Sequence, residues 1–445
     1  MSTDELVTQV VAATSIIVAL SYLLRSVARR LGQPEVIGQI FAGIALGPSL
    51  LGHLPGDPTE TLFPTQVLPY ISVLAQVALV PFMFAVSCEL DLRVLRQRRR
   101  LVPAVTAGAF VIPMLLGVGT AFLIGPLYTP PEGPAHDNVS FVMFMAVAMA
   151  VTAVPVLAGI IRERGAAGSL PGVVAMTSAG IIDALGWLFL AAAILMSSST
   201  DGDHLPLPVT VALFAGYLVT MWCVVRPLLG RWLSRAGARA RDDLPVVAAL
   251  AMASAWATAA LELHVIFGAF VAGLIMPRND AGEPEPDLVR PLQETGTVLL
   301  PVFFVVSGLS VDIGALTADD YALLAILGTV AIAGKLGGGV LGARVGGMSY
   351  REATIVGVML NTRGLTELIA LNMGLQSGII DESLYTVLVL VALVTTVLTG
   401  PALTLLRFPE PRATPKGAQA DEAVLPRQSE DESVPRNPAG ELPGA

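Results

Sequence analysis

The basic residues of this chain are distributed in a strict alternation. Of the 26 Lys and Arg residues, all but two lie in every second connection between long apolar stretches. Basic residues collect on the cytoplasmic side of membrane proteins. The alternation therefore predicts a multi-pass membrane protein with its N-terminus outside and its C-terminus in the cytoplasm. The preference for Arg over Lys is typical of bacterial genes rich in G and C, so we expect the plasma membrane.

The apolar stretches predict the fold class. Hydrophobic residues make up 54% of the chain and charged residues 14%, whereas a water-soluble domain carries roughly 25% charged residues. Because one crossing takes about 20 apolar residues, we expect an all-α polytopic protein with about thirteen transmembrane helices in the lipid bilayer. The expected spans are about 6–24, 34–52, 67–87, 101–124, 139–161, 172–196, 207–229, 244–260, 263–276, 293–309, 319–343, 352–374 and 384–406.

The order of these spans predicts two inverted six-helix repeats. The first six spans begin outside, the span at about 207–229 crosses inward, and the last six begin inside. Inverted repeats are common in secondary transporters, whose sites lie at mid-membrane where broken helices meet. Residues 408–445 are rich in Pro, Glu, Ala and Gly, so we expect a transmembrane domain at 1–407 and a disordered cytoplasmic tail. The net charge of −9 comes largely from outer loops and this tail, and gives no reason to expect a nucleic-acid partner.

Each half contains a candidate helix break at the corresponding position. Span five contains TAVP at 152–155, and span twelve contains NTRG at 361–364. Pro155 lacks an N–H and clashes with the carbonyl one turn earlier, while Asn361 and Gly364 favour non-helical backbone. Irregular backbone inside a membrane is tolerated where it lines a cavity or is buried in protein. We therefore expect two broken, crossing helices; a pair of ordinary kinks is the alternative.

Asp183 is the first candidate for the chemistry, because a carboxyl group inside an apolar span usually marks an ion or proton path. Burial disfavours the charged carboxylate, so Asp183 can hold either a proton or a hard monovalent cation, but not both well. Hard cations take oxygen ligands, which Thr152, the carbonyls of the first break and Ser178 can supply. This competition would couple the flux of cations to that of protons. A structural aspartate paired with a basic residue is the alternative.

Three further charges lie inside apolar spans. Lys335 either pairs with a carboxylate, for which Asp183 is the best candidate, or titrates itself. Pairing predicts a switch in which an arriving cation displaces the lysine; the alternative is that Lys335 only fixes its helix. Arg363 and Glu367 are four residues apart, so they can face each other on one helix. Because Arg363 keeps its proton, we expect this pair to hold the break and balance half-helix dipoles rather than to bind the ion.

Sequence motifs of other protein classes occur here only in surroundings that do not suit those classes. Gly334, Gly338, Gly342 and Gly346 recur every four residues, which indicates close helix packing rather than a nucleotide-binding loop. The sequence contains no nucleophile–base arrangement, zinc motif or phosphate loop in a usable context. We therefore expect a transporter and not an enzyme, with no cofactor and no metal beyond a transported Na⁺ or K⁺.

At these residues the chain resembles the monovalent cation:proton antiporter-2 family, especially the membrane domain of plant-type cation/proton exchangers. The resemblance covers most of residues 30–375 and is carried by QPEVIG at 33–38, LGPSLLG at 46–52, TAVPVLA at 152–158, Asp183 with Trp187, GAFVAG at 268–273, LPVFFVVSGL at 300–309, Lys335, and NTRGLTEL at 361–368. It implies an elevator-type homodimer. The moving core would be the helices at about 101–196 and 319–406, the dimer scaffold those at about 6–87 and 244–309, and the linker that at about 207–229. It also implies that Thr152 and Asp183 correspond to cation-site positions.

Two departures from the family qualify this expectation. The family commonly has Asn or Asp just before the essential aspartate, where this chain has Ile182. Because a second carboxylate is associated with electrogenic exchange, we expect electroneutral exchange. Many relatives also carry a cytoplasmic nucleotide-binding regulatory domain, and because the tail at 408–445 is short, we expect no such domain here.

The function expected from the sequence is therefore secondary antiport of a monovalent cation, Na⁺ or K⁺, against protons. An exchanger of organic substrates for protons is the first alternative. A membrane sensor that has kept the fold without transport is the second, and Ile182 is the residue that favours it.

Overall fold

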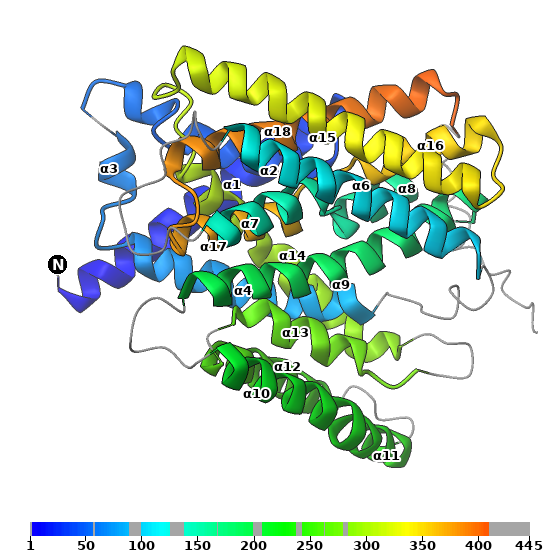
Figure 1. Cartoon of the computed structure of the whole chain (residues 1–445). Coiled ribbons are helices and arrows are strands. Elements are labelled where there is room, and N and C mark those ends of the chain that lie inside the picture. The colour runs from blue at the N-terminus through cyan, green and yellow to red at the C-terminus, as the bar shows by residue number, and fades with distance from the viewer. Residues whose placement is uncertain are drawn as a thin grey trace, which may run out of the picture. The chain divides into compact units, whose positions relative to one another are not determined.

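The computed structural model describes residues 2–56, 58–88, 99–124, 138–166, 168–198, 207–236, 243–261, 263–278 and 284–408. In this part of the chain the regular elements are helices, which confirms the predicted fold class (Figure 1). The predicted tail lies outside the described residues from position 409 onward. The helices are α1 (Thr3–Arg30), α2 (Glu35–Leu46), η1 (Leu51–His53), α3 (Pro58–Leu62), α4 (Leu68–Cys88), α6 (Leu101–Ile124), α7 (Asn138–Ala150), α8 (Val154–Glu163), α9 (Leu170–Ser198), α10 (Leu207–Thr220), η2 (Met221–Val225), α11 (Arg226–Ala236), α12 (Leu244–Ala260), α13 (Val265–Leu274), α14 (Pro286–Leu309), α15 (Ala318–Val345), α16 (Tyr350–Leu360), α17 (Leu365–Gln376) and α18 (Glu382–Leu405).

Most of the predicted spans correspond to helices long enough to cross a bilayer. Within the described ranges, nine helical segments are long and apolar enough, and the bent pair α16–α17 makes a tenth. The shorter apolar helices α2, α12 and α13 lie at the three other predicted spans. The structure therefore supports a polytopic membrane protein, while the full count of thirteen crossings stays a prediction.

The helices pack mainly within two groups. The first group contains α1, α2, α4, α12, α13 and α14, which contact one another. In the second, α6, α7, α9, α15, α16 and α18 contact one another, and α8 packs on α9. Helix α17 touches members of both groups, because it packs on α7, α8, α9 and α18 and also on α14. We refer to these sets below as the first and second helix groups.

Within the second group, α6 and α15 contact each other most extensively (Figure 1). A Cβ atom at Gly338 would overlap the backbone of Gly108, and one at Gly342 would overlap the backbone of Ala104. The glycine repeat therefore allows the two backbones to touch, as the sequence predicted. This contact also brings Lys335, which is buried on α15, against the backbone of α6.

Candidate ion-binding site at the crossing of two broken helices

Both predicted breaks interrupt their helices. Helix α7 ends at Ala150, and α8 begins at Val154 with Pro155 in its first turn, where a proline needs no N–H donor. Helix α16 ends at Leu360, α17 begins at Leu365, and the two axes differ in direction by 42°.

The two breaks contact each other directly. The N–H of Ala153 donates to the carbonyl of Thr362 over 3.1 Å. The hydroxyl of Thr152 donates to the carbonyl of Leu360 over 3.1 Å. Gly364 lies so close to the first break that a Cβ there would come within 2.7 Å of a methyl carbon of Val156. Backbone groups that lose their helical partners are thus partly satisfied by the opposite break, which is how irregular backbone persists in an apolar interior.

Lys335 does not form the expected ion pair with Asp183. Its ammonium donates instead to the hydroxyl of Thr152 over 2.7 Å, to the carbonyl of Ala109 over 3.2 Å and to the carbonyl of Ala150. These three acceptors match the three donors of an ammonium group. The physical reason for the difference is that the interrupted end of α7 offers unpaired oxygens closer to Lys335 than the carboxylate is.

Arg363 and Glu367 face each other as expected. Their side chains are fully buried and form an ion pair of 2.5 Å. The guanidinium also donates to the carbonyls of Ala148 and Met149, over 2.7 and 2.9 Å, at the end of α7. Arg363 therefore ties the second break to the last turn of the helix before the first break.

The carboxyl group of Asp183 is buried on α9, with 1% of the residue exposed. Neither carboxyl oxygen has a hydrogen-bond partner among the described residues. Polar groups of Thr366 and Trp187 approach this carboxyl, and Lys335 acts on it through its charge. Ser178 is not among them: it lies five residues earlier on the same helix, about 140° round the axis. The hydroxyl of Ser178 is buried without a hydrogen-bond partner in the described part of the chain, and its part as a ligand stays a prediction.

Thr366 and Trp187 are contacts that the sequence reasoning did not assign to the site. Trp187 follows Asp183 by four residues, so helical spacing alone places the two side chains on one face. Thr366 gave no such signal, because its direction depends on how the chain leaves the second break.

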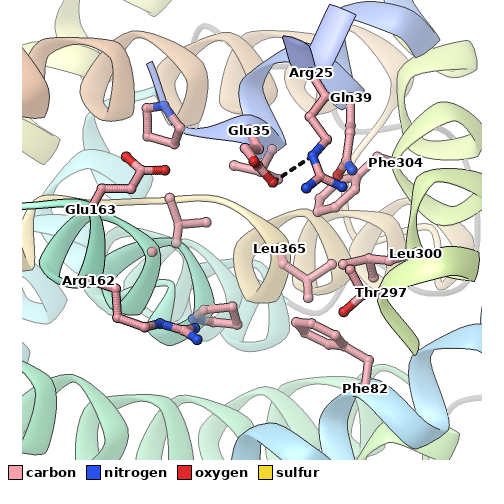
Figure 2. A pocket seen from close by; sticks show the side chains of 15 residues that line it. Arg25, Glu35, Gln39, Phe82, Arg162, Glu163, Thr297, Leu300, Phe304 and Leu365 are labelled. Carbon is pink, nitrogen blue, oxygen red and sulfur yellow. Dashed lines mark ion pairs between the residues drawn. The ribbon is translucent and has the colours of Figure 1, made fainter. Parts of the chain in front are cut away.

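A cavity of about 200 Å³ opens between the two helix groups (Figure 2). Arg25 and Glu35, an ion pair of 2.6 Å, line it from the first group, together with Gln39, Phe82 and Phe304. Pro155, Arg162 and Glu163 of α8 and Leu365 of α17 line it from the other side. The cavity therefore extends from residues on the predicted cytoplasmic side to both broken helices.

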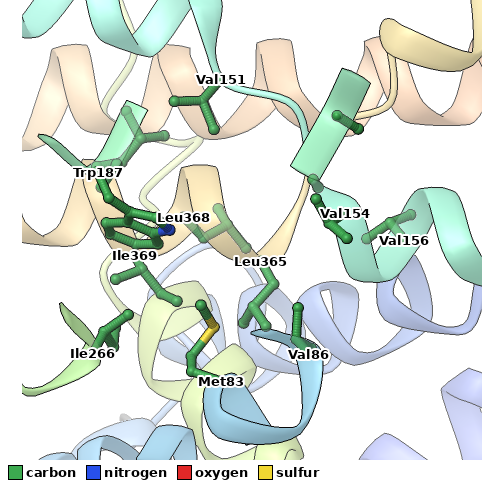
Figure 3. Close-up of a cluster of buried hydrophobic side chains, with 14 of the residues drawn as sticks. Met83, Val86, Val151, Val154, Val156, Trp187, Ile266, Leu365, Leu368 and Ile369 are labelled. Carbon is green, nitrogen blue, oxygen red and sulfur yellow. The ribbon is translucent and has the colours of Figure 1, made fainter. Parts of the chain in front are cut away.

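Next to this cavity, apolar side chains pack between the two helix groups. Figure 3 shows Ile369, beside Trp187 and Leu368, facing Met83 of α4 and Ile266 of α13, and all five of these residues are buried. Farther along α17, a second cavity of only about 30 Å³ is lined by Asn372 and Gln376. Of these two cavities beside α17, the one near Arg25 and Arg162 is therefore the larger.

Two broken helices that cross inside an apolar bundle, with buried charges at the crossing, define the site architecture of a secondary transporter. The family described as "Sodium/hydrogen exchanger, transmembrane" matches residues 15–408, and the chain belongs to this family of integral membrane transporters. It is a transporter family and not an enzyme family.

Individual relatives agree with this membership. The chain is 33% identical over 407 residues to the Na(+)/H(+) antiporter NhaS4 of Synechocystis sp., covering 90% of this chain and 98% of that protein. It is 34% identical over 407 residues to Cation/H(+) antiporter 20 of Arabidopsis thaliana, covering 88% of this chain and 48% of that protein. With K(+)/H(+) antiporter 1 of Saccharomyces cerevisiae it shares 32% identity over 392 residues, 85% of this chain and 44% of that protein. The chain thus spans about half the length of the last two relatives.

The fold is also that of a solved structure. The sodium proton antiporter MjNhaP1 from Methanocaldococcus jannaschii superimposes with a TM-score of 0.64 at 12% identity, covering 90% of this chain and 97% of that one.

Proposed function

We propose that the protein is a secondary antiporter that exchanges a monovalent cation, Na⁺ or K⁺, for protons. The observation that carries the proposal is the carboxyl group of Asp183, which is buried beside the crossing of the broken helices without an ion-pair partner in the described part of the chain. An unpaired carboxylate in an apolar interior is costly. It becomes stable there when it holds a proton or a cation, and only one of the two at a time.

The oxygens of the first break complete the proposed site. Thr152 and the carbonyl of Ala150 offer oxygen ligands of the kind that hard cations prefer. In the structure the ammonium of Lys335 already occupies both of these oxygens. We propose that Lys335 acts as a tethered cation, which an arriving Na⁺ or K⁺ displaces from the break. The switch expected from the sequence is retained, but its partner is the break and not Asp183.

Movement of the second helix group against the first would carry the site across the membrane. The larger cavity beside Arg25 and Arg162 supports the proposal that the site opens toward the cytoplasmic side, where the sequence predicts these basic residues to lie. In this elevator-type scheme the second group is the core, the first is the scaffold, and two copies would join through their scaffolds as a homodimer. The plasma membrane and an outside N-terminus belong to the same proposal.

One-for-one exchange follows from the single carboxylate. Ile182, beside Asp183, is fully buried and adds no second acid. One carboxylate can bring one proton in each cycle and exchange it for one monovalent cation. We therefore propose that the exchange is electroneutral.

The test is proton flux in everted membrane vesicles under an imposed pH gradient. Adding Na⁺ or K⁺ should collapse the gradient with the unaltered protein and not with Asp183→Asn. Asp319→Asn, an exposed aspartate in the first turn of α15, is the matched control and should behave as the unaltered protein does. Undiminished flux in folded Asp183→Asn refutes the mechanism. No response of the unaltered protein to any cation refutes the function and favours an organic substrate or a sensor.

A further inference from the structure

The hydroxyl of Thr366, like those of Thr106 and Thr210, is buried without a partner among the described residues, and it differs in this from the hydroxyls of Thr395 and Thr399. Thr395 and Thr399 of α18 donate to the carbonyls of Val391 and Thr395, one turn earlier, over 2.9 and 3.0 Å. This back-bonding is the usual arrangement for a threonine within a helix. Thr366 is 1% exposed, yet its hydroxyl has no hydrogen-bond partner in the described part of the chain.

The second break explains this difference. The carbonyl one turn before Thr366 belongs to Thr362, which lies in the break and accepts the N–H of Ala153 over 3.1 Å. Because α17 begins only at Leu365, no regular turn precedes Thr366. Its hydroxyl is therefore available to a group outside its own helix.

The group that it approaches is the carboxyl of Asp183. The indole N–H of Trp187 approaches the same carboxyl, and it too lacks a normal hydrogen bond to any described residue. Four buried polar atoms from three residues thus converge from α9 and α17 without satisfying one another. Such groups carry a large desolvation cost unless a further polar species joins them.

The orientation of the indole is fixed from the other side. The ring of Trp187 packs edge-on against Phe267 of α13, with centroids 5.5 Å apart and planes at 81°. In Figure 3 it also lies beside Leu368 and Ile369 of α17. The indole can donate a hydrogen bond but cannot ligate a cation.

We infer that the hydroxyl oxygen of Thr366 is a ligand of the transported cation together with Asp183, and that Trp187 positions the carboxylate for it. This inference rests on the proposed antiport and adds residues to its site. Hard monovalent cations take several oxygen ligands, and Thr366 supplies one from the second broken helix opposite those of the first. With the ion bound, the N–H of Trp187 would donate to one lone pair of the carboxylate and leave the others for the ion.

The inference predicts different effects for the two residues. Removing an oxygen ligand weakens binding of the ion and changes the ranking of ions, because selectivity depends on the number and spacing of ligands. Removing the indole N–H loosens the carboxylate for every ion alike, so it weakens binding without changing the ranking.

The experiment measures apparent KM and maximal rate for Na⁺, K⁺ and Li⁺ in the everted-vesicle assay. Thr366→Val keeps the shape of the side chain and removes the oxygen. It should raise the KM of the preferred ion by about tenfold, with a smaller change in maximal rate. Thr366→Ser should restore the KM. Trp187→Phe, which retains an aromatic ring against Phe267, should raise the KM for all three ions by a similar factor.

The control is Thr399→Val, which removes an equally buried hydroxyl that is bonded within α18. It should leave KM and ion ranking unchanged. If Thr366→Val does not fold, Thr366→Ala and Thr366→Ser are compared instead, since only the first lacks the oxygen. An unchanged KM and ranking in the folded variant without the oxygen, or the same change in Thr399→Val, overturns the inference. If the unaltered protein transports and Asp183→Asn does not, such a result overturns only the role of Thr366, and the proposed antiport stands. Failure of the inference can therefore be distinguished from failure of the proposed function.

Discussion

Replacing Arg363 by methionine tests whether the buried ion pair holds the two breaks together. The change leaves the carboxylate of Glu367 buried without its partner and removes the donors to the carbonyls of Ala148 and Met149. Breaking a buried pair by removing one partner costs about 3–5 kcal/mol. Glu367→Gln should cost less, about 1–3 kcal/mol, because Arg363 keeps both carbonyls and the amide oxygen can still accept. Arg363→Met should therefore lower the free energy of unfolding by about 2 kcal/mol more than Glu367→Gln does.

The assay is thermal unfolding of the purified protein in detergent, followed by tryptophan fluorescence at one fixed heating rate, because membrane proteins often unfold irreversibly. A matched control exists in Arg290 and Glu294, which have the same spacing of four residues and form an ion pair of 2.9 Å, but are 79% and 66% exposed. Arg290→Met should cost at most about 1 kcal/mol. The double variant of Arg363→Met with Glu367→Gln should be less destabilised than the sum of the two single changes, because the pair is coupled.

Two outcomes would refute this reasoning. The first is that Glu367→Gln destabilises the protein as much as Arg363→Met does. The second is that Arg363→Met unfolds at the temperature of the unaltered protein but no longer transports. That result would assign the guanidinium a direct part in ion movement instead of a structural one.

Two further changes test the break and the helix packing. Lys335→Met removes the ammonium from the hydroxyl of Thr152 and the carbonyl of Ala150, which leaves both oxygens to the transported cation. The apparent KM for the cation should therefore fall by about tenfold, and the maximal rate should also fall. An unchanged KM in the vesicle assay would limit Lys335 to a packing role. Gly338→Ala should lower thermal stability because its Cβ would overlap the backbone of Gly108, whereas Gly337→Ala, which meets no atom within 4 Å, should be neutral or stabilising by about 0.5–1 kcal/mol. Equal melting temperatures for the two alanine variants would contradict the proposed close packing of α6 and α15.

Local chemistry explains why much of the site could be predicted. A proline at position 155 and an asparagine and glycine at 361 and 364 disfavour regular helix wherever they stand, and both helices are interrupted at these residues. The spacing of four between Arg363 and Glu367 was enough to predict their contact. The partner of Lys335 was not predictable in this way. It depends on the close approach of α6 and α15, which brings Ala109 and the end of α7 to the ammonium.

The sequence alone therefore determined the membrane-spanning class, the positions of the helix breaks and the identity of the buried charges, because each follows from hydrophobicity, backbone preference or the cost of charge in hydrocarbon. The tertiary structure decided which groups these charges meet. Lys335 binds the oxygens of the first break, Asp183 lies near Thr366 and Trp187, and Ser178 is not among its contacts. Apart from Trp187, which lies one turn from Asp183 on α9, these partners come from helices far apart in the sequence. Their directions are fixed only when the two breaks cross and the helices pack.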